Sequence, residues 1–329
     1  MTWRALPKVE LHLHLEGAAP PEFIRGLAKE KRIDLSKIFA QDGSYAYRDF
    51  VHFLSVYEAA TSVLKSPEDF KRLTLAVLEE SASEGVVYSE TFLSPDFCGG
   101  RDLVAWREYL AAMAEAADEA DAKFGITLKG IVTCIRHFGP DKARETARCA
   151  AETKGDFLRG FGMAGDENVG KPGDFTWAFD CAREAGLRLT SHACEWRGPD
   201  EVTQTLDALK VERIGHGVRA HSDATVMARV IDEGVVLEVC PLSNVVLGVF
   251  ADMASHPIER MRAHGVKVTV STDDPPFFHT TMSKEYAALE QAFGWDEAVF
   301  AEINSTALEA AFCDAETKEK IAARLANGR

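Results

Sequence analysis

Short runs of apolar and β-branched residues alternate with longer segments of helical periodicity along most of this chain. Runs of this kind indicate buried strands, and the amphipathic segments between them indicate helices. The pattern predicts eight strands, at residues 9–15, 86–93, 127–134, 158–163, 187–192, 213–217, 235–239 and 266–271. It predicts helices between them, for example at residues 103–124, 142–153 and 175–184.

Eight nearly apolar strands that alternate with helices are typical of a closed parallel barrel. An open, doubly wound sheet would show the same alternation. Such a sheet usually carries a glycine-rich phosphate turn after its first strand, and Leu-Glu-Gly-Ala-Ala-Pro at 15–20 is not one. We therefore expect residues 1–329 to form a single domain, a (β/α)8 or TIM barrel.

The connection between the first two predicted strands, residues 16–85, is by far the longest in the chain. It contains at least three helical stretches, including residues 47–64 and 67–83. Long insertions after barrel strands usually build a cover over the site at the mouth of the barrel. The sequence therefore predicts a helical lid here.

The charge and the cysteines narrow the class of partner. The chain has 37 Lys and Arg against 52 Asp and Glu, a net charge of −15 that repels nucleic-acid phosphates. It has no uninterrupted apolar run of about 18 residues, the length that a membrane span requires. The seven cysteines are at least thirteen residues apart, which fits neither a disulfide framework nor a Cys-x-x-Cys metal site. We expect a cytoplasmic protein with a small-molecule partner, without nucleic-acid or membrane binding.

Histidines and acids recur where the predicted strands end. His12 and His14 are two residues apart on the first strand, so both side chains should point into the barrel. Others end or follow the fifth, sixth and eighth strands: His192, His216, Asp273 and Asp274. Because the carboxyl ends of barrel strands meet at one mouth, these side chains should converge. Three imidazoles and a carboxylate would suit Zn²⁺, with one position left for water.

Six segments resemble, in the same order, the motifs of the adenosine deaminase family, a branch of the amidohydrolase superfamily that includes adenosine and adenine deaminases. They are Pro-Lys-Val-Glu-Leu-His-Leu-His-Leu-Glu-Gly at 7–17, Ala-Gly-Asp-Glu at 164–167, Ser-His-Ala-Cys-Glu at 191–195, Arg-Ile-Gly-His-Gly at 213–217, Cys-Pro-Leu-Ser-Asn at 240–244 and Ser-Thr-Asp-Asp-Pro at 271–275. The resemblance implies zinc-dependent hydrolysis of adenosine or deoxyadenosine to inosine or deoxyinosine and ammonia. The alternative is a deaminase of adenine or of a modified adenosine such as aminodeoxyfutalosine.

The resemblance also implies roles for individual residues. The zinc ligands would be His12, His14, His192 and Asp273. Glu195 would protonate purine N1, His216 would orient and deprotonate the attacking water, and Asp273 would flank that water. The implied substrate-binding residues are His14, Glu16, Gly165 through its N–H, Asp274 at the imidazole edge, and Phe53 and Leu54 on the lid.

Elementary chemistry agrees with these roles. Zinc lowers the pKa of bound water towards about 7, which supplies hydroxide at neutral pH. Attack at C6 disrupts the aromatic ring and is difficult unless N1 is protonated. Glu195 follows the expected ligand His192 by three residues and could supply this proton if burial raises its pKa.

The sequence departs from the family pattern at two positions. Glu16 stands where adenosine deaminases usually have an Asp that contacts the ribose 5′-hydroxyl, and Glu also occurs in relatives that act on adenine or modified nucleosides. Cys194 stands where the family usually has Gly, and we expect its small side chain to be tolerated.

Other residues carry weaker signals. Phe53, Leu54 and Tyr57 form a stripe that resembles the family's apolar gate, although helix packing alone would also produce it. Ser243 and Asn244 belong to a matching motif but could simply brace their loop. The remaining histidines match no motif and are expected to be structural or on the surface: His52, His137, His221, His256, His264 and His279.

Three rival classes are less consistent with the sequence. A binuclear amidohydrolase often needs a bridging lysine after the fourth strand, where residues 162–167 contain none and the nearest is Lys171. A cytidine-deaminase zinc site needs a Pro-Cys-x-x-Cys pair, which the chain lacks. A non-catalytic binding protein would have little reason to carry Glu195, His216 and Asp274 beside a full ligand set.

Overall fold

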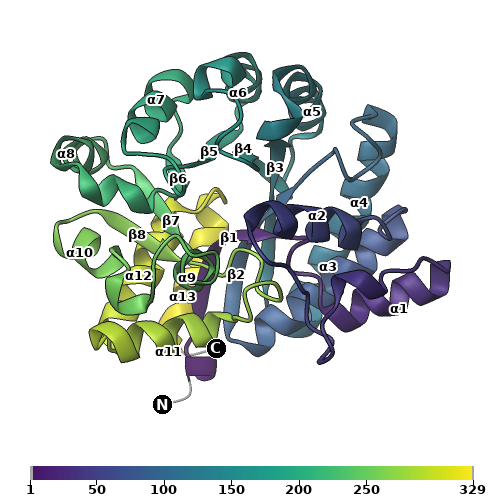
Figure 1. Ribbon diagram of the computed structural model, residues 1–329, viewed down its shortest axis with the longest axis horizontal. Coiled ribbons are helices and arrows are strands. Elements are labelled where there is room, and N and C mark those ends of the chain that lie inside the picture. The colour runs from purple at the N-terminus through teal and green to yellow at the C-terminus, as the bar shows by residue number, and fades with distance from the viewer. Residues whose placement is uncertain (1–2, 328–329) are drawn as a thin grey trace.

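A computed structural model describes residues 3–327 of the chain and shows a (β/α)8 barrel (Figure 1). The strands are parallel and pair in sequence order from β1 to β8. They are β1 Lys8–His14, β2 Val86–Leu93, β3 Thr127–Ile135, β4 Leu158–Ala164, β5 Arg188–Ala193, β6 Arg213–His216, β7 Val236–Val239 and β8 Lys267–Val270. The fold predicted from the hydrophobic pattern is confirmed.

Helices surround the barrel and follow the strands in turn (Figure 1). Those between β2 and β8 are α4 Leu103–Phe124, α5 Pro140–Thr153, α6 Thr176–Glu184, α7 Asp200–Leu209, α8 Ala224–Asp232, α9 Pro241–Val246 and α10 Ile258–Ala263. The chain then adds α11 Met282–Phe293, α12 Glu297–Ala310 and α13 Ala315–Asn327. Within residues 3–327, none of the helices has both the length and the apolar character needed to span a membrane.

The barrel closes between β1 and the residues that follow β8. The backbone N–H of His14 donates to the carbonyl of Asp273 at 3.0 Å, and the N–H of Asp273 donates to the carbonyl of His12 at 3.1 Å. The closure therefore does more than complete the sheet. It fixes Asp273 directly beside the two histidines of β1.

Predicted and observed elements agree residue for residue in one strand and two helices. The ranges predicted for β2, α3 and α4 are those observed. The sixth strand ends one residue earlier than predicted, because His216 has a positive φ of 60° that turns the chain out of the sheet. The eighth strand also ends one residue early, at Val270. Apolar patterning does not reveal such a turn.

The long first connection contains α1 Pro21–Lys31, α2 Phe50–Thr61 and α3 Pro67–Ser83. Helix α2 begins three residues later than predicted, because the Asp49 side chain accepts a hydrogen bond from the N–H of His52 at 2.8 Å and caps the helix. Side chains of α2 line the cavity at the barrel mouth. Whether α2 moves as a lid stays a prediction.

The barrel interior holds a buried charge network beneath the mouth. Arg213 on β6 is 1% exposed and forms ion pairs with Glu90 at 2.7 Å and Glu238 at 2.6 Å. Its guanidinium group lies 3.6 Å from the centroid of the Phe312 ring. Because buried charges need partners, the two carboxylates balance the buried guanidinium group of Arg213.

Candidate active site

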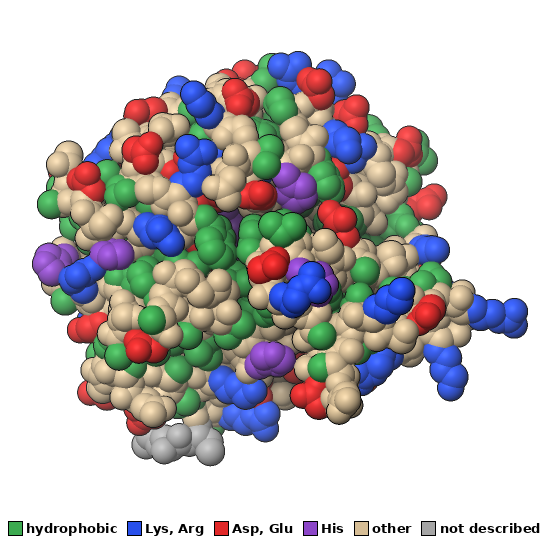
Figure 2. Space-filling view, in the orientation of Figure 1, with side chains coloured by type: hydrophobic (Ala, Val, Ile, Leu, Met, Phe, Trp, Pro, Cys, Tyr) green, Lys and Arg blue, Asp and Glu red, His purple; other side chains and the backbone are tan. Residues whose placement is uncertain are grey.

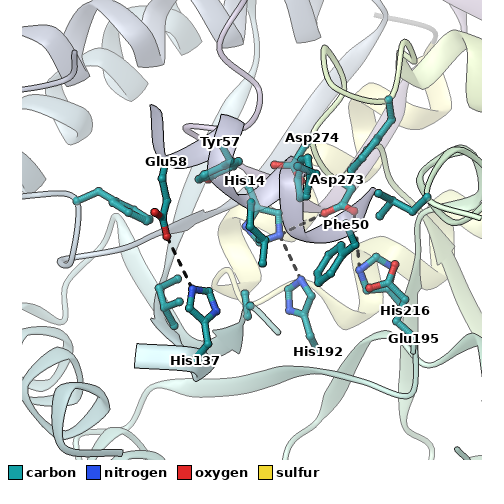
Figure 3. A pocket seen from close by; sticks show the side chains of 18 residues that line it. His14, Phe50, Tyr57, Glu58, His137, His192, Glu195, His216, Asp273 and Asp274 are labelled. Atoms are coloured by element: carbon teal, nitrogen blue, oxygen red, sulfur yellow. Dashed lines mark hydrogen bonds and ion pairs between the residues drawn. The ribbon is translucent and has the colours of Figure 1, made fainter. Parts of the chain in front are cut away.

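Three histidines and an aspartate converge at the barrel mouth, as expected from the positions of the strand ends. Figure 3 shows three of the four, His14, His192 and Asp273. Each of the four residues His12, His14, His192 and Asp273 offers one atom, and these four atoms lie within 4.8 Å of one another. The Nε2 atom of His14 lies 3.2 Å from both Asp273 Oδ1 and His192 Nε2. A cluster of this composition could hold a metal ion.

Local geometry aims these side chains at one point. Strand alternation directs His12 and His14 inward, and β6 passes close to His12 because residue 215 is glycine. A Cβ atom at Gly215 would lie 2.8 Å from Cε1 of His12. The Ser243 hydroxyl donates to Asp273 Oδ2 at 2.7 Å and fixes that carboxylate.

The second nitrogen of two of these rings is engaged elsewhere. His12 donates from Nδ1 to Glu238 Oε2 at 2.8 Å, and His192 donates from Nδ1 to the carbonyl of Met163 at 2.9 Å. When neutral, each ring would present an unprotonated Nε2 to the cluster, which is the form that binds metal. Burial opposes protonation of His12, but its contacts with Asp273 and Glu238 raise the pKa of its ring to about 9, so a bound metal would replace that proton.

The hydrogen bonding and the charge of the four clustered residues fit a bound metal ion. Nε2 of His12 is buried and has no hydrogen-bond partner within residues 3–327. Burial opposes ionisation of Asp273, but its contacts with His12 and His14 hold the pKa of its carboxyl well below the usual range. An orphaned buried nitrogen beside an ionised carboxylate fits a bound cation.

Glu195 lies on the other side of the cavity floor and is 6% exposed. Burial, followed by the negative charge of Asp273, raises the pKa of its carboxyl well above the usual value. Its backbone N–H donates to the Glu167 carboxylate at 3.0 Å, which anchors the loop after β5. Glu195 can therefore hold a proton at neutral pH.

His216 is fully buried at the end of β6. Its Nε2 lies 3.9 Å from Asp273 Oδ2, and its Nδ1 lies 3.2 Å from the side-chain nitrogen of Asn244. Burial lowers the pKa of the ring to about 3, so it is neutral. Asn244 also donates to Glu195 Oε1 at 2.9 Å and thus connects both side chains.

Asp274 lines the cavity beside these groups. Burial and then the charge of Asp273 raise the pKa of the Asp274 carboxyl well above its usual value, so it carries a proton. Its Oδ1 atom is buried and has no hydrogen-bond partner in the described part of the chain. A Cβ atom at Gly17 would lie 1.5 Å from this oxygen, so Oδ1 packs directly against the backbone that follows β1.

The cavity at the barrel mouth has an empty volume of about 680 Å³, which includes space open to solvent. Its polar floor includes His14, Gly165, Glu195 and Asp274. Its outer wall is largely aromatic and comes from α2 and two loops: Phe50, Phe53, Leu54, Tyr57, Phe97 and Phe278. Figure 2 shows hydrophobic side chains gathered near the middle of this face. The cavity suits a flat, polar-edged ring.

Glu16 has a different position from the other predicted substrate-binding residues. Within the described residues, Tyr57 lines the cavity but Glu16 does not. The Tyr57 hydroxyl lies 3.4 Å from Glu16 Oε2, so the tyrosine stands between the glutamate and the cavity. Burial raises the pKa of the Glu16 carboxyl to about 7.

The other departure, Cys194, is fully buried with a positive φ of 61°. This is the left-handed region that favours glycine, which explains why glycine is usual there. Cys194 is not among the described residues that line the cavity.

Sequence reasoning missed some residues around the site. Glu238 gave no signal beyond its place on an apolar strand, and Asn244 was recognised only as part of a motif. His137, expected to be structural or on the surface, lines the cavity, and its Nε2 lies 4.0 Å from Glu58 Oε1 on α2 (Figure 3). Contacts between elements distant in sequence leave no local pattern.

This fold and this cluster are typical of metal-dependent amidohydrolases. The chain belongs to the adenosine deaminase family, whose model matches residues 7–327. It is 46% identical over 320 residues to proteins named adenine deaminase from Chelativorans sp. (strain BNC1) and Agrobacterium fabrum (strain C58), covering 97% of this chain and 98% of each relative.

Solved structures are similar as well. The crystal structure of adenine deaminase from Arthrobacter aurescens is 31% identical with a TM-score of 0.89, and the match covers 98% of each chain. An amidohydrolase from Burkholderia ambifaria, with bound Zn, is 28% identical with a TM-score of 0.87, covering 99% of this chain and 91% of the other.

Proposed function

We propose that this protein is an adenine deaminase, which hydrolyses the C6 amine of adenine to give hypoxanthine and ammonia. The metal-type cluster is the set His12, His14, His192 and Asp273. The observation that carries the proposal is that three of these residues, His14, His192 and Asp273, line one cavity. The buried acid Glu195 and the protonated Asp274 line the same cavity. The names of the relatives at 46% identity support adenine rather than the nucleoside expected from the motifs.

The wall formed by α2 supports the same choice. The motif resemblance placed the 5′ end of a ribose at Glu16, but Tyr57 stands between that carboxylate and the cavity. A sugar could reach Glu16 only if the tyrosine moved. A free base makes no such demand, so the wall favours adenine.

We further propose zinc as the metal, held by His12, His14, His192 and Asp273. The mixed imidazole and carboxylate donor set and the bound Zn in the related amidohydrolase support this assignment. Zinc held there would lower the pKa of a water molecule towards neutrality. The chain's own side chains would do the rest of the chemistry.

In this proposal Glu195 gives its proton to purine N1, which makes C6 electrophilic. The protonated Asp274 donates a hydrogen bond to the imidazole edge, and the Gly165 N–H binds the pyrimidine edge. The neutral His216 orients the water whose oxygen bonds to C6, and Asp273 flanks it. The C6–amine bond breaks after the amine gains one proton of this water, so ammonia leaves and the ring keeps the oxygen. The other proton of the water returns to Glu195, which restores its acid form.

A steady-state comparison of adenine, adenosine, deoxyadenosine and aminodeoxyfutalosine, followed by ammonia release, tests the proposal. We expect kcat/KM for adenine to exceed that for each nucleoside by on the order of 100-fold. A nucleoside that is turned over more efficiently than adenine would show that the substrate is wrong. No ammonia from any of the four would contradict the deaminase itself.

A further inference from the structure

Asn244 lies at the centre of a fully buried hydrogen-bond chain between the catalytic groups and a histidine outside the cavity. It is held in α9, directly after β7, and its backbone carbonyl accepts hydrogen bonds from the N–H groups of Val249 and Phe250 at 2.9 and 3.3 Å. Its side chain contacts Glu195 and His216 on one side and His256 on the other. The position of the amide is therefore fixed, and two orientations remain, which differ by exchange of its oxygen and nitrogen.

The hydrogen bonds of His256, at the far end of this network, determine the orientation of the Asn244 amide. The backbone N–H of Ile258 lies 3.2 Å from Nδ1 of His256. A backbone N–H can only donate, so Nδ1 of His256 must accept. His256 is 3% exposed, and burial lowers its pKa to about 3, so the ring is neutral and carries its one proton on Nε2.

That proton fixes Asn244. Nε2 of His256 lies 3.2 Å from the Asn244 side-chain oxygen, which must be the acceptor. The two hydrogens of the Asn244 amide then point at Glu195 Oε1, 2.9 Å away, and at His216 Nδ1, 3.2 Å away. The reversed amide would place its NH₂ group against a nitrogen that already carries hydrogen.

The consequence reaches both catalytic side chains. Oε1 of Glu195 is an acceptor, so its acid proton belongs on Oε2, the oxygen left for the substrate. Nδ1 of His216 is also an acceptor, so the neutral ring carries its proton on Nε2, which faces Asp273 at 3.9 Å. His216 then donates a hydrogen bond towards the attacking water and orients it, but does not deprotonate it as the motif resemblance implied.

We propose that Asn244 and His256 are positioning residues that place the proton of Glu195 on Oε2 and that of His216 on Nε2. The catalytic consequence rests on the proposed function, because Glu195 and His216 act as described only in that reaction. The proton placement itself is a property of the resting protein and can be measured without substrate.

Substitutions of His256 test the catalytic consequence. We expect His256→Leu to lower kcat for adenine roughly 10- to 100-fold with little change in KM, the size typical of lost outer-shell hydrogen bonds. His256→Gln, which offers an N–H near the position of Nε2, should recover most of that loss. His221→Leu is the matched control, because His221 also packs near Phe250 but bonds to Val218 instead.

Metal content and thermal unfolding distinguish a variant that has lost the proton placement from one that has lost its fold or its metal. His256→Leu should retain the metal content of the wild type, since none of the cluster residues bonds to His256. A kcat within twofold of the wild type in a folded, metal-loaded His256→Leu protein would overturn the proposal. Equal losses in His256→Leu and His256→Gln would do the same.

Nitrogen NMR of the histidine rings provides a direct readout besides activity. In substrate-free protein labelled with ¹⁵N-histidine, His256 and His216 should both be neutral with the proton on Nε2, and Asn244→Ala should alter the His216 signals. A proton on Nδ1 of His256 would overturn the proposal even if every variant lost activity. If no purine is deaminated, the proposed function fails while this measurement still decides the proton placement.

Discussion

Glu238 accepts a hydrogen bond from His12 at 2.8 Å, and this contact links the metal-type cluster to the buried charge network of the barrel. The other oxygen of Glu238 lies 2.6 Å from Arg213 and accepts from the Thr190 hydroxyl at 2.9 Å. Burial opposes ionisation, but Arg213 and His12 hold the pKa of Glu238 below its usual value. The negative charge orients the imidazole and strengthens it as a ligand.

This relationship predicts that Glu238→Gln weakens metal binding. Loss of the carboxylate should lower metal affinity about 10- to 100-fold, as measured by competition with a chelator. Thr190→Val is the graded control, because it removes a neutral hydrogen bond to Glu238 and leaves the charge. An affinity in Glu238→Gln equal to that of the wild type would show that the contact has no such role.

The cluster itself predicts one metal ion per chain. Metal analysis of purified protein should give close to one equivalent, and His12→Ala should lose most of it because one of the proposed ligands is gone. His52→Ala, at a half-buried position in the first turn of α2, controls for loss of a histidine elsewhere. Two tightly held equivalents in active protein would favour a binuclear site instead.

Removal of the proposed acid should separate binding from chemistry. Glu195→Gln keeps the shape and the hydrogen bond from Asn244 but cannot deliver a proton to N1. We expect unchanged metal content, adenine affinity within a few-fold, and a fall in kcat of about 10²- to 10⁴-fold. Turnover within a few-fold of the wild type would remove Glu195 from the mechanism.

Tyr57 should set the preference for a base over a nucleoside. Tyr57→Ala opens the path between the cavity and Glu16, so the ratio of kcat/KM for adenosine to that for adenine should rise roughly tenfold or more. Tyr57→Phe keeps the ring and should change the ratio much less. The wall has no such role if the alanine variant leaves the ratio unchanged.

Glu285 should make stability fall as the pH rises. Burial raises the pKa of its carboxyl to about 8 from its ordinary value of 4.5, so the folded state holds a proton that the unfolded chain releases. Between these values the free energy of unfolding should decrease with pH, by about 1.4 kcal/mol per unit for one such group.

Glu285→Gln should remove that dependence. The amide oxygen can accept from the N–H of Leu242, and the Thr280 hydroxyl can rotate to accept from the amide nitrogen, so both contacts of the carboxyl survive. When the free energy of unfolding is measured in urea at several pH values between 5 and 8, its decrease with pH should be smaller for the variant than for the wild type. Parallel slopes for the two proteins would contradict the raised pKa.

The sequence by itself determined the barrel and the members of the cluster. Strand periodicity depends on local burial, so β2 could be predicted residue for residue. Alternation places His12 and His14 on one face, and the carboxyl ends of parallel strands must meet. The motifs then separated His192, His216 and Asp273 from the chain's other histidines and acids.

Only the tertiary structure decided how these groups are supported and what surrounds them. The contact of Glu238 with His12 joins β7 to β1, and that of Tyr57 with Glu16 joins α2 to the end of β1. The orientation of Asn244 depends on His256, which the sequence left without a role. Each of these contacts joins separate elements across the folded interior, so periodicity and spacing, which report only on neighbours along the chain, could not reveal them.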